Sequence, residues 1–206
     1  MPEFLHIPPT DLFAWLAGIA FAAGLNVYAT VAALGLLARF GHLPLPGGLQ
    51  LLDSWTVIAA SLVLFVIEFF ADKVPAFDLI WNALHTFVRV PVAGLIAFEA
   101  TKQLSPEKQL LATLLGVGIA FAAHGGKMAA RAAVTPSPEP WSNMGLSLGE
   151  DILAVGLTWI AMRHPYVAGG IALILVMAAI MLGRWVIRAL SKLLLGASKE
   201  VRRAAA

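Results

Sequence analysis

Cysteine is absent from this sequence of 206 residues, and charged residues are scarce. The absence of cysteine excludes disulfide bonds, cysteine-ligated zinc and iron–sulfur clusters. Asp, Glu, Lys and Arg make up 13% of the chain and apolar residues 60%, with a mean hydropathy of +0.84. A typical soluble domain has about 25% charged and about 45–50% apolar residues. A chain this short cannot hide such an apolar excess in its own core, so we expect a lipid environment.

Several catalytic and nucleic-acid signatures are also missing. The sequence contains no phosphate-binding loop and no His-Glu-x-x-His zinc motif. Its net charge of +2 does not suggest a nucleic-acid partner. We therefore expect no enzymatic activity, no catalytic residues and no cofactor, while a metal ion stays open. The expected partners are the lipid bilayer and a small ion or solute, and a homo-oligomer is compatible with the sequence.

Long apolar segments account for most of the chain. The first holds no charged residue from Leu12 to Ala38, and about 20 apolar residues are enough for a helix to cross a bilayer. We predict an all-α integral membrane protein, a single membrane domain over 1–206 with a tail from 196 onwards. The segment at 76–101 could span, or could be an interfacial helix with a short re-entrant piece. About six transmembrane segments are expected, at about 12–39, 54–73, 76–101, 108–134, 143–163 and 166–195.

An internal repeat is suggested by the string GIAFAA, which occurs at 18–23 and again at 118–123. Each copy opens a set of three apolar segments, so we predict two repeats, about 12–101 and 108–195. Three spans per repeat would make the repeats inverted, a recurring plan of secondary transporters. Each string is followed by helix-disfavouring residues that predict broken or re-entrant helices. These residues are Gly24 to Asn26 and, more firmly, Gly125 and Gly126, since each glycine costs about 1 kcal/mol in a helix.

Carboxylates at membrane depth are costly and are candidates for function. Glu68 and Asp72 lie one helical turn apart near the end of the second segment. They could form a cation or proton site, or they could mark an interfacial helix end where Lys73 pairs with one of them. Glu150 and Asp151 lie near the middle of the fifth segment, where two adjacent carboxylates cannot both be bare anions. A cation must neutralise them, or one must hold a proton, which favours a functional role.

Basic residues at similar depth provide counter-charges. Lys127 and Arg131 lie one turn apart after the two glycines, and they could bind an anion or pair with Glu150 or Asp151. The fourth and fifth segments are joined by a short proline-rich connector, so we predict that these four residues meet in the protein interior. Lys127 and Glu150 would then lie at similar depth in a low dielectric, where unpaired charges cost several kcal/mol.

A polar stripe follows the third segment with the spacing i, i+4, i+7, i+11. Such a stripe lines a cavity or faces lipid headgroups. Within it, His85 alone is a weak metal ligand, but it could belong to a proton path if carboxylates lie near. The stripe consists of Asp78, Asn82, His85 and Arg89.

Several strings resemble a bacterial family of small polytopic membrane proteins classed as a domain of unknown function. They are GLNVYAT at 24–30, EFFADKVP at 68–75, HTFVR at 85–89 and SPEPWSN at 137–143, with Glu150-Asp151 behind the last one. The resemblance covers roughly 12–195. It implies membership of the family and no particular activity.

We interpret the sequence as a small secondary transporter or channel for an ion or small ionic solute. The residues expected to bind the ion or substrate are Glu68, Asp72, Glu150, Asp151, Asn26, Lys127, Arg131, His85 and Arg89. The alternative is a non-transporting membrane scaffold or accessory subunit in which the buried charges are structural. A solvated acidic face would favour transport, and a dry, fully paired network would favour the scaffold.

The orientation follows from the basic residues after the last segment. Arg184, Arg188 and Lys192 lie on one helical face and precede further basic residues in the tail. The positive-inside rule therefore predicts a multi-pass protein of the inner (plasma) membrane with a cytoplasmic C-terminus. With six spans, the N-terminus would also be cytoplasmic.

Overall fold

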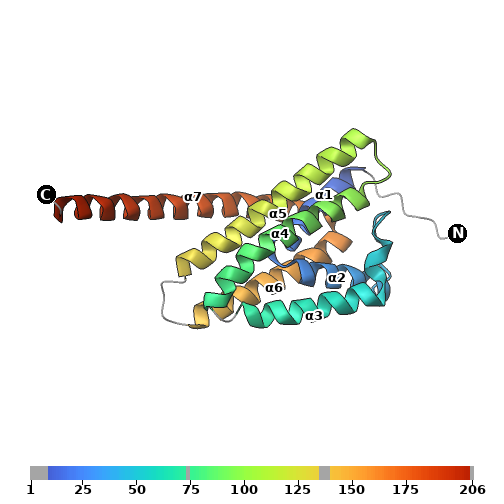
Figure 1. The fold of residues 1–206 in the computed structure, drawn as a ribbon. Helices are drawn as coiled ribbons and strands as arrows, with labels where there is room; N and C mark the ends of the chain where they lie inside the picture. Colours follow the sequence, from blue (N-terminus) through green and yellow to red (C-terminus); the bar gives the residue numbers. More distant parts are fainter. Residues whose placement is uncertain (1–8, 73–74, 135–139, 205–206) are drawn as a thin grey trace.

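Helices form every regular element in the part of the chain that the computed structural model describes, residues 9–72, 75–134 and 140–204 (Figure 1). Lys73 and the side chains of Asp78 and Asn143 lie outside it. Five of the helices begin at a proline, whose fixed φ suits the first turn and whose missing N–H is not needed there. The elements are α1 (Pro9–Leu25), α2 (Val27–Phe40), the 3₁₀ turn η1 (Gln50–Asp53), α3 (Trp55–Ala71), α4 (Pro75–Ala100), α5 (Pro106–Val134), α6 (Pro140–Arg163) and α7 (Pro165–Ala204).

Among the described residues, four helices are long and apolar enough to cross a membrane. These stretches are Ile80–Ala100, Pro106–Val134, Met144–Arg163 and Pro165–Lys192. The stretch in α4 continues through Pro91, so the third predicted segment has the length of a full span rather than an interfacial piece. The helices α1, α2 and α3 are apolar but shorter.

The first predicted span is two helices that are interrupted at Asn26. Asn26 has an extended backbone, with φ −147° and ψ 102°, and its side-chain oxygen accepts a hydrogen bond from the Ala29 amide at 2.9 Å. Asparagine is a favoured N-cap, so this residue both ends α1 and starts α2. With 17 and 14 residues, the two helices are about 26 and about 21 Å long, each short of a hydrocarbon core of about 30 Å. The predicted break after Gly24 is therefore present.

The outer ends of α1 and α2 lie at the same end of the bundle, which makes the pair an antiparallel helical hairpin with Asn26 at its tip (Figure 1). Gly48, in the loop after α2, packs against the carbonyl of Glu99 near the end of α4, with a φ of +97° that favours glycine. At the same end of the bundle, the Tyr166 hydroxyl donates a hydrogen bond to Asp11 at the start of α1. We call this pair of helices the α1–α2 hairpin.

The hairpin changes the expected order of helices. After it, the chain passes back and forth along α3, α4, α5, α6 and α7, so that the start of α1 and the end of α7 lie at opposite ends of the bundle (Figure 1). Segment 12–39 is therefore two helices that reverse at Asn26, and not the one continuous helix expected from the sequence.

The predicted break at Gly125 and Gly126 is also wrong, because α5 continues from Pro106 to Val134. A Cβ added to Gly126 would lie 2.5 Å from the Cβ of Ala179 on α7, while one added to Gly125 would meet nothing within 4 Å. Gly126 thus lets two helices approach closely, a common use of glycine in membrane helices. Tertiary packing outweighs the helix propensity of two glycines.

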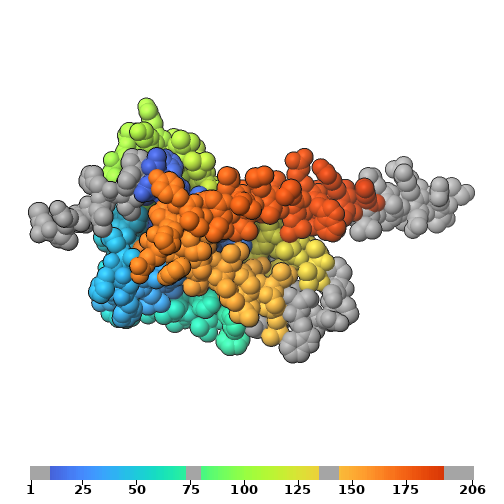
Figure 2. All heavy atoms as spheres, turned by 180° about the vertical axis from the view of Figure 1, so that it is seen from behind, coloured from blue at the N-terminus to red at the C-terminus, as the bar shows by residue number. Residues whose placement is uncertain are grey.

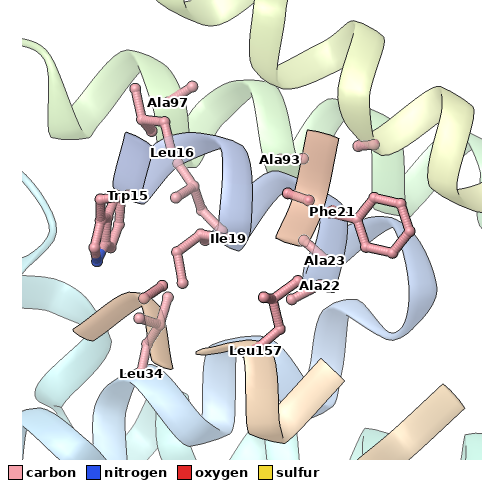
Figure 3. Close-up of a cluster of buried hydrophobic side chains, with 14 of the residues drawn as sticks. Trp15, Leu16, Ile19, Phe21, Ala22, Ala23, Leu34, Ala93, Ala97 and Leu157 are labelled. Carbon is pink, nitrogen blue, oxygen red and sulfur yellow. The ribbon is translucent and has the colours of Figure 1, made fainter. Parts of the chain in front are cut away.

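Apolar residues gather in two places, inside the bundle and on its outer surface. Figure 3 shows Leu16 and Ile19 of α1 beside side chains from α2, α4 and α6, and all of them are buried. Large apolar side chains on α3 to α7 are exposed, for example Phe87 at 81%. Helix α7 lies along one face, and its later part projects beyond the other helices (Figures 1 and 2). An apolar exterior of this kind suits lipid rather than water.

Candidate functional site: a buried charge cluster at the hairpin tip

Seven charged side chains from four consecutive helices of the chain converge inside the bundle. Each is at most 9% exposed. We call this group the charge cluster. Its members are Glu68 of α3, Asp72 just after α3, Arg89 of α4, Lys127 and Arg131 of α5, and Glu150 and Asp151 of α6.

Two cations and two carboxylates form the centre of the cluster. Glu150 Oε2 lies 3.0 Å from Lys127 Nζ and 2.8 Å from Arg131 Nη2. Asp72 Oδ2 lies 3.1 Å from Lys127 Nζ and 3.0 Å from Arg131 Nη2. The predicted meeting of Lys127 and Arg131 with Glu150 is confirmed. Asp72, which the sequence placed in a separate pair, completes a ring of alternating charge.

Glu68 and Arg89 extend this ring toward α4. Arg89 Nη2 donates to Glu68 Oε1 at 2.5 Å, and Lys127 Nζ lies 3.7 Å from the same oxygen. Arg89 Nη1 also donates to Asn82 Oδ1 at 2.8 Å. Asn82 and Arg89 are both fully buried, so this part of the polar stripe on α4 faces the protein interior and not the headgroups.

His124 is part of the same network, although it is not among the site residues expected from the sequence. Its Nδ1 lies 3.0 Å from Arg89 Nη1, and a guanidinium has no acceptor, so Nδ1 must accept. A neutral ring then carries its proton on Nε2 and donates to Thr86 Oγ1 at 2.7 Å. His124, Lys127 and Arg131 lie at i, i+3 and i+7 on one face of α5, and that spacing could have identified the residue.

His85 lies apart from the charged groups. Its Nδ1 donates to the Trp81 carbonyl at 2.8 Å, so in the neutral ring Nε2 accepts from the Tyr28 hydroxyl at 3.1 Å. The ring also stacks on Trp81, with centroids 4.2 Å apart. His85 therefore connects α4 to the α1–α2 hairpin, and neither of these two hydrogen bonds involves a carboxylate.

Asp151 is the carboxylate that the cations of the cluster leave unpaired. Its Oδ1 accepts a hydrogen bond from Asn26 Nδ2 at 2.8 Å. Within the described residues, its Oδ2 has no hydrogen-bond partner and neither oxygen has a salt bridge. Lys127 instead donates to the Leu25 carbonyl at 3.4 Å, at the C-terminal end of α1. Of the two carboxylates that the sequence offered as partners for Lys127 and Arg131, the structure pairs Glu150 with them and not Asp151.

The cluster is not balanced in charge. Its four carboxylates face three cations, and a neutral His124 adds nothing. One unit of negative charge is therefore in excess among the described buried groups, and it belongs to Asp151 by the geometry of the pairs. A buried carboxylate of this kind must be met by a proton or a cation.

An apolar groove between α3 and α6 reaches this carboxylate. It has a volume of about 460 Å³ and opens on the outer surface of the bundle. Its lining residues are Phe65 and Phe69 of α3, and Leu148, Asp151, Ile152, Val155 and Gly156 of α6. The sequence interpretation missed this groove because α3 and α6 are far apart along the chain.

Two further patterns bear on chemistry. Gly145 to Gly149 reads Gly-x-Ser-x-Gly, which the sequence interpretation overlooked. Ser147 lies within α6 and is fully buried, whereas the nucleophile of that motif stands on a strand-to-helix turn. Across the described part of the chain, no group of three or more His, Asp or Glu side chains is arranged to hold a metal ion.

Comparison with characterised proteins and with solved structures gives no match. A family model described as a domain of unknown function, DUF4126, matches residues 13–185. This covers most of the chain and agrees with the resemblance of the four strings. The protein therefore belongs to this family of unknown function, as a helical protein with membrane-like spans and a buried charge cluster.

Proposed function

We propose that the protein is a small secondary transporter or channel for an ion or small ionic solute, and that Asp151 holds the transported proton or cation. One observation carries this proposal. Asp151 lies at the tip of the α1–α2 hairpin, bonded to Asn26, and has no salt bridge in the described part of the chain. Intramembrane carboxylates of this kind mark ion and proton pathways.

The other carboxylates are poorly suited to the same task. Glu68, Asp72 and Glu150 each lie within 3.1 Å of a cationic side chain. A transported cation would have to displace one of these internal partners, which is expensive in a low dielectric. Arg89, Lys127 and Arg131 therefore act as internal counter-charges that fix the fold around Asp151.

The hairpin tip supports a role in ion handling. Interrupted helices place backbone carbonyls and unpaired amides inside a membrane, where they can contact ions, and transporters use such breaks at their binding sites. At Asn26 the last carbonyl of α1 accepts from Lys127, and the first turn of α2 is capped by the side chain that also binds Asp151. A shift at this residue would change both contacts together.

An inverted arrangement is part of the proposal. The helices α2, α3 and α4 alternate in direction along the bundle, and α5, α6 and α7 alternate in the opposite order (Figure 1). An inverted repeat of these two sets would match α2 with α5. The repeated string GIAFAA instead pairs α1 with α5, and those two helices run in the same direction (Figure 1). We propose the first pairing and a cytoplasmic C-terminus, which puts the open end of the hairpin on the outer side.

The second candidate function is a scaffold or accessory subunit. It is favoured by the close pairing of Glu68, Asp72 and Glu150, which resembles a network that joins helices. Under this proposal, Asp151 serves only to hold Asn26. Removing its charge would then alter the stability of the protein, and no ion flux would depend on it.

A flux assay separates the two candidates. The purified protein is reconstituted into liposomes that contain a pH-sensitive dye, and an imposed K⁺ or Na⁺ gradient is used to drive proton movement. Asp151→Asn should abolish flux, since the amide keeps the bond to Asn26 but carries no charge. Asp53→Asn, the same change at an exposed residue of η1, is the matched control. Flux of the wild type equal to that of empty liposomes, or full flux in Asp151→Asn, would contradict the transport proposal.

A further inference from the structure

We propose that the groove between α3 and α6 binds an apolar organic cation that enters from the bilayer, with Asp151 as its counter-charge. This inference rests on the proposed function of Asp151 and deepens it, because it names the chemical class of the solute. The protein would then exchange protons for the organic cation, because both would compete for the carboxylate of Asp151.

The unpaired oxygen of Asp151 is the first argument. The residue is 6% exposed, and Oδ1 is already bonded to Asn26. Oδ2 is itself buried and has no hydrogen-bond partner among the described residues, and Asp151 is one of the residues that line the groove. A buried carboxylate oxygen without a partner is costly, so a ligand that supplies positive charge there is stabilised.

The walls of the groove are the second argument. Except for Asp151, every lining residue is apolar: two phenylalanines, three aliphatic side chains and Gly156. A hydrated inorganic ion would have to lose its water without receiving oxygen ligands in exchange. An organic cation brings its own apolar body, which the walls can contact, and phenyl rings also attract cations through their π faces.

Access to the groove is the third argument. The groove opens on the outer surface of the bundle, next to Leu148 and Ile152, which are 52% and 64% exposed. At bilayer depth this surface faces lipid, so the route of entry is lateral. Apolar solutes partition into the bilayer and reach the groove without crossing an aqueous path.

Charge and size restrict the ligand further. The cluster has one negative charge in excess, with four carboxylates against three cations. A monovalent cation therefore neutralises the cluster, whereas an anion would increase its excess negative charge. The volume of about 460 Å³ lies within the roughly 300–1,000 Å³ range of small-molecule pockets. A compact cation with several aromatic or aliphatic groups satisfies both limits.

The experiment uses a pair of probes with the same shape and opposite charge. Tetraphenylphosphonium and tetraphenylborate are titrated by calorimetry against the full-length protein in detergent. We expect saturable binding of the cation and none of the anion. Equal binding of the two ions, or no saturable binding of the cation, would overturn the proposal.

Two variants test the location of the site. Asp151→Asn should weaken binding of tetraphenylphosphonium by roughly tenfold or more, since it removes the counter-charge. Gly156→Leu should do the same by filling the groove, because Gly156 lines it and a Cβ added there meets nothing within 4 Å. Gly170→Leu on α7 is the matched control, with equally open space and no place in the groove lining.

The outcomes separate this inference from the proposed function. If Asp151→Asn does not fold, Gly156→Leu still tests the groove, and unchanged binding in it would overturn the site. Proton flux that depends on Asp151, without any binding of tetraphenylphosphonium, would refute the organic cation and leave the transporter proposal intact. Binding that depends on both Asp151 and an unfilled groove, without Asp151-dependent proton flux under a K⁺, Na⁺ or tetraphenylphosphonium gradient, would support the site and refute the transport function.

Discussion

Asn26 Nδ2 donates a hydrogen bond to Asp151 Oδ1 at 2.8 Å, which fastens the tip of the α1–α2 hairpin to the middle of α6. The same asparagine caps α2 through its side-chain oxygen. One amide group therefore satisfies a helix end and a buried carboxylate at once. The position of the hairpin and the environment of Asp151 depend on each other through this residue.

Replacing Asn26 with alanine should destabilise the protein more than replacing an ordinary N-cap. Loss of the cap costs about 1 kcal/mol, and an unsatisfied buried carboxylate costs about 1–3 kcal/mol more. Ser54→Ala is the matched control, because Ser54 caps α3 through Val57 at 3.3 Å and lies outside the cluster. Thermal unfolding in detergent measures both variants. Equal losses in the two would mean that the bond to Asp151 contributes nothing.

Glu150 and Lys127 should behave as a coupled pair. Glu150→Gln leaves Lys127 and Arg131 to share Asp72, and breaking a buried pair from one side costs about 3–5 kcal/mol. Adding Lys127→Met removes a cation that Glu150→Gln has left without its carboxylate, so the double variant should be more stable than the sum of the single losses predicts. Melting temperatures of the two single variants and the double variant give the coupling. Strictly additive losses would contradict the 3.0 Å contact between these residues.

Replacing Gly125 or Gly126 of α5 with alanine should change the stability of the protein in opposite directions. Gly126→Ala forces a Cβ to within 2.5 Å of Ala179, so α5 and α7 must separate and the protein should lose stability. Gly125→Ala meets nothing within 4 Å and should gain up to about 1 kcal/mol from helix propensity. Each variant is the control for the other in the same unfolding assay. A gain in stability at both positions would argue against close packing of the two helices.

The α1–α2 hairpin predicts which sites share one side of the membrane. The chain contains no cysteine, so single cysteines can be labelled with a membrane-impermeant maleimide without background. Thr10→Cys, at the start of α1, and Gly47→Cys, after α2, should react from the same side of intact cells. Ser191→Cys near the end of α7 should react from the other side. Labelling of Thr10→Cys and Gly47→Cys from opposite sides would mean that segment 12–39 crosses the membrane.

Part of the site could be predicted from the sequence because it depends on local geometry. Lys127 and Glu150 lie at similar distances from the short connector between α5 and α6, so equal depth follows from the rise of a helix. Opposite charges at equal depth then pair, as observed at 3.0 Å. The contacts of Asp72 and Glu68 with these residues could not be predicted in this way, since α3 is not adjacent to α5 or α6 in the chain.

The sequence by itself determined the class of the protein and the chemistry of its interior. An apolar fraction of 60% requires lipid, the prolines mark where helices begin, and the few buried charges must find partners in any fold. Tertiary structure decided the rest. Gly126 could break a helix or pack one, and only the approach of Ala179 selects packing. Asp151 could have paired with Lys127. It binds Asn26 instead, because Glu150 and Asp72 occupy the positions next to the cation. Several carboxylates can pair with the same cation in the protein interior, and only the tertiary structure determines which of them lies within contact distance.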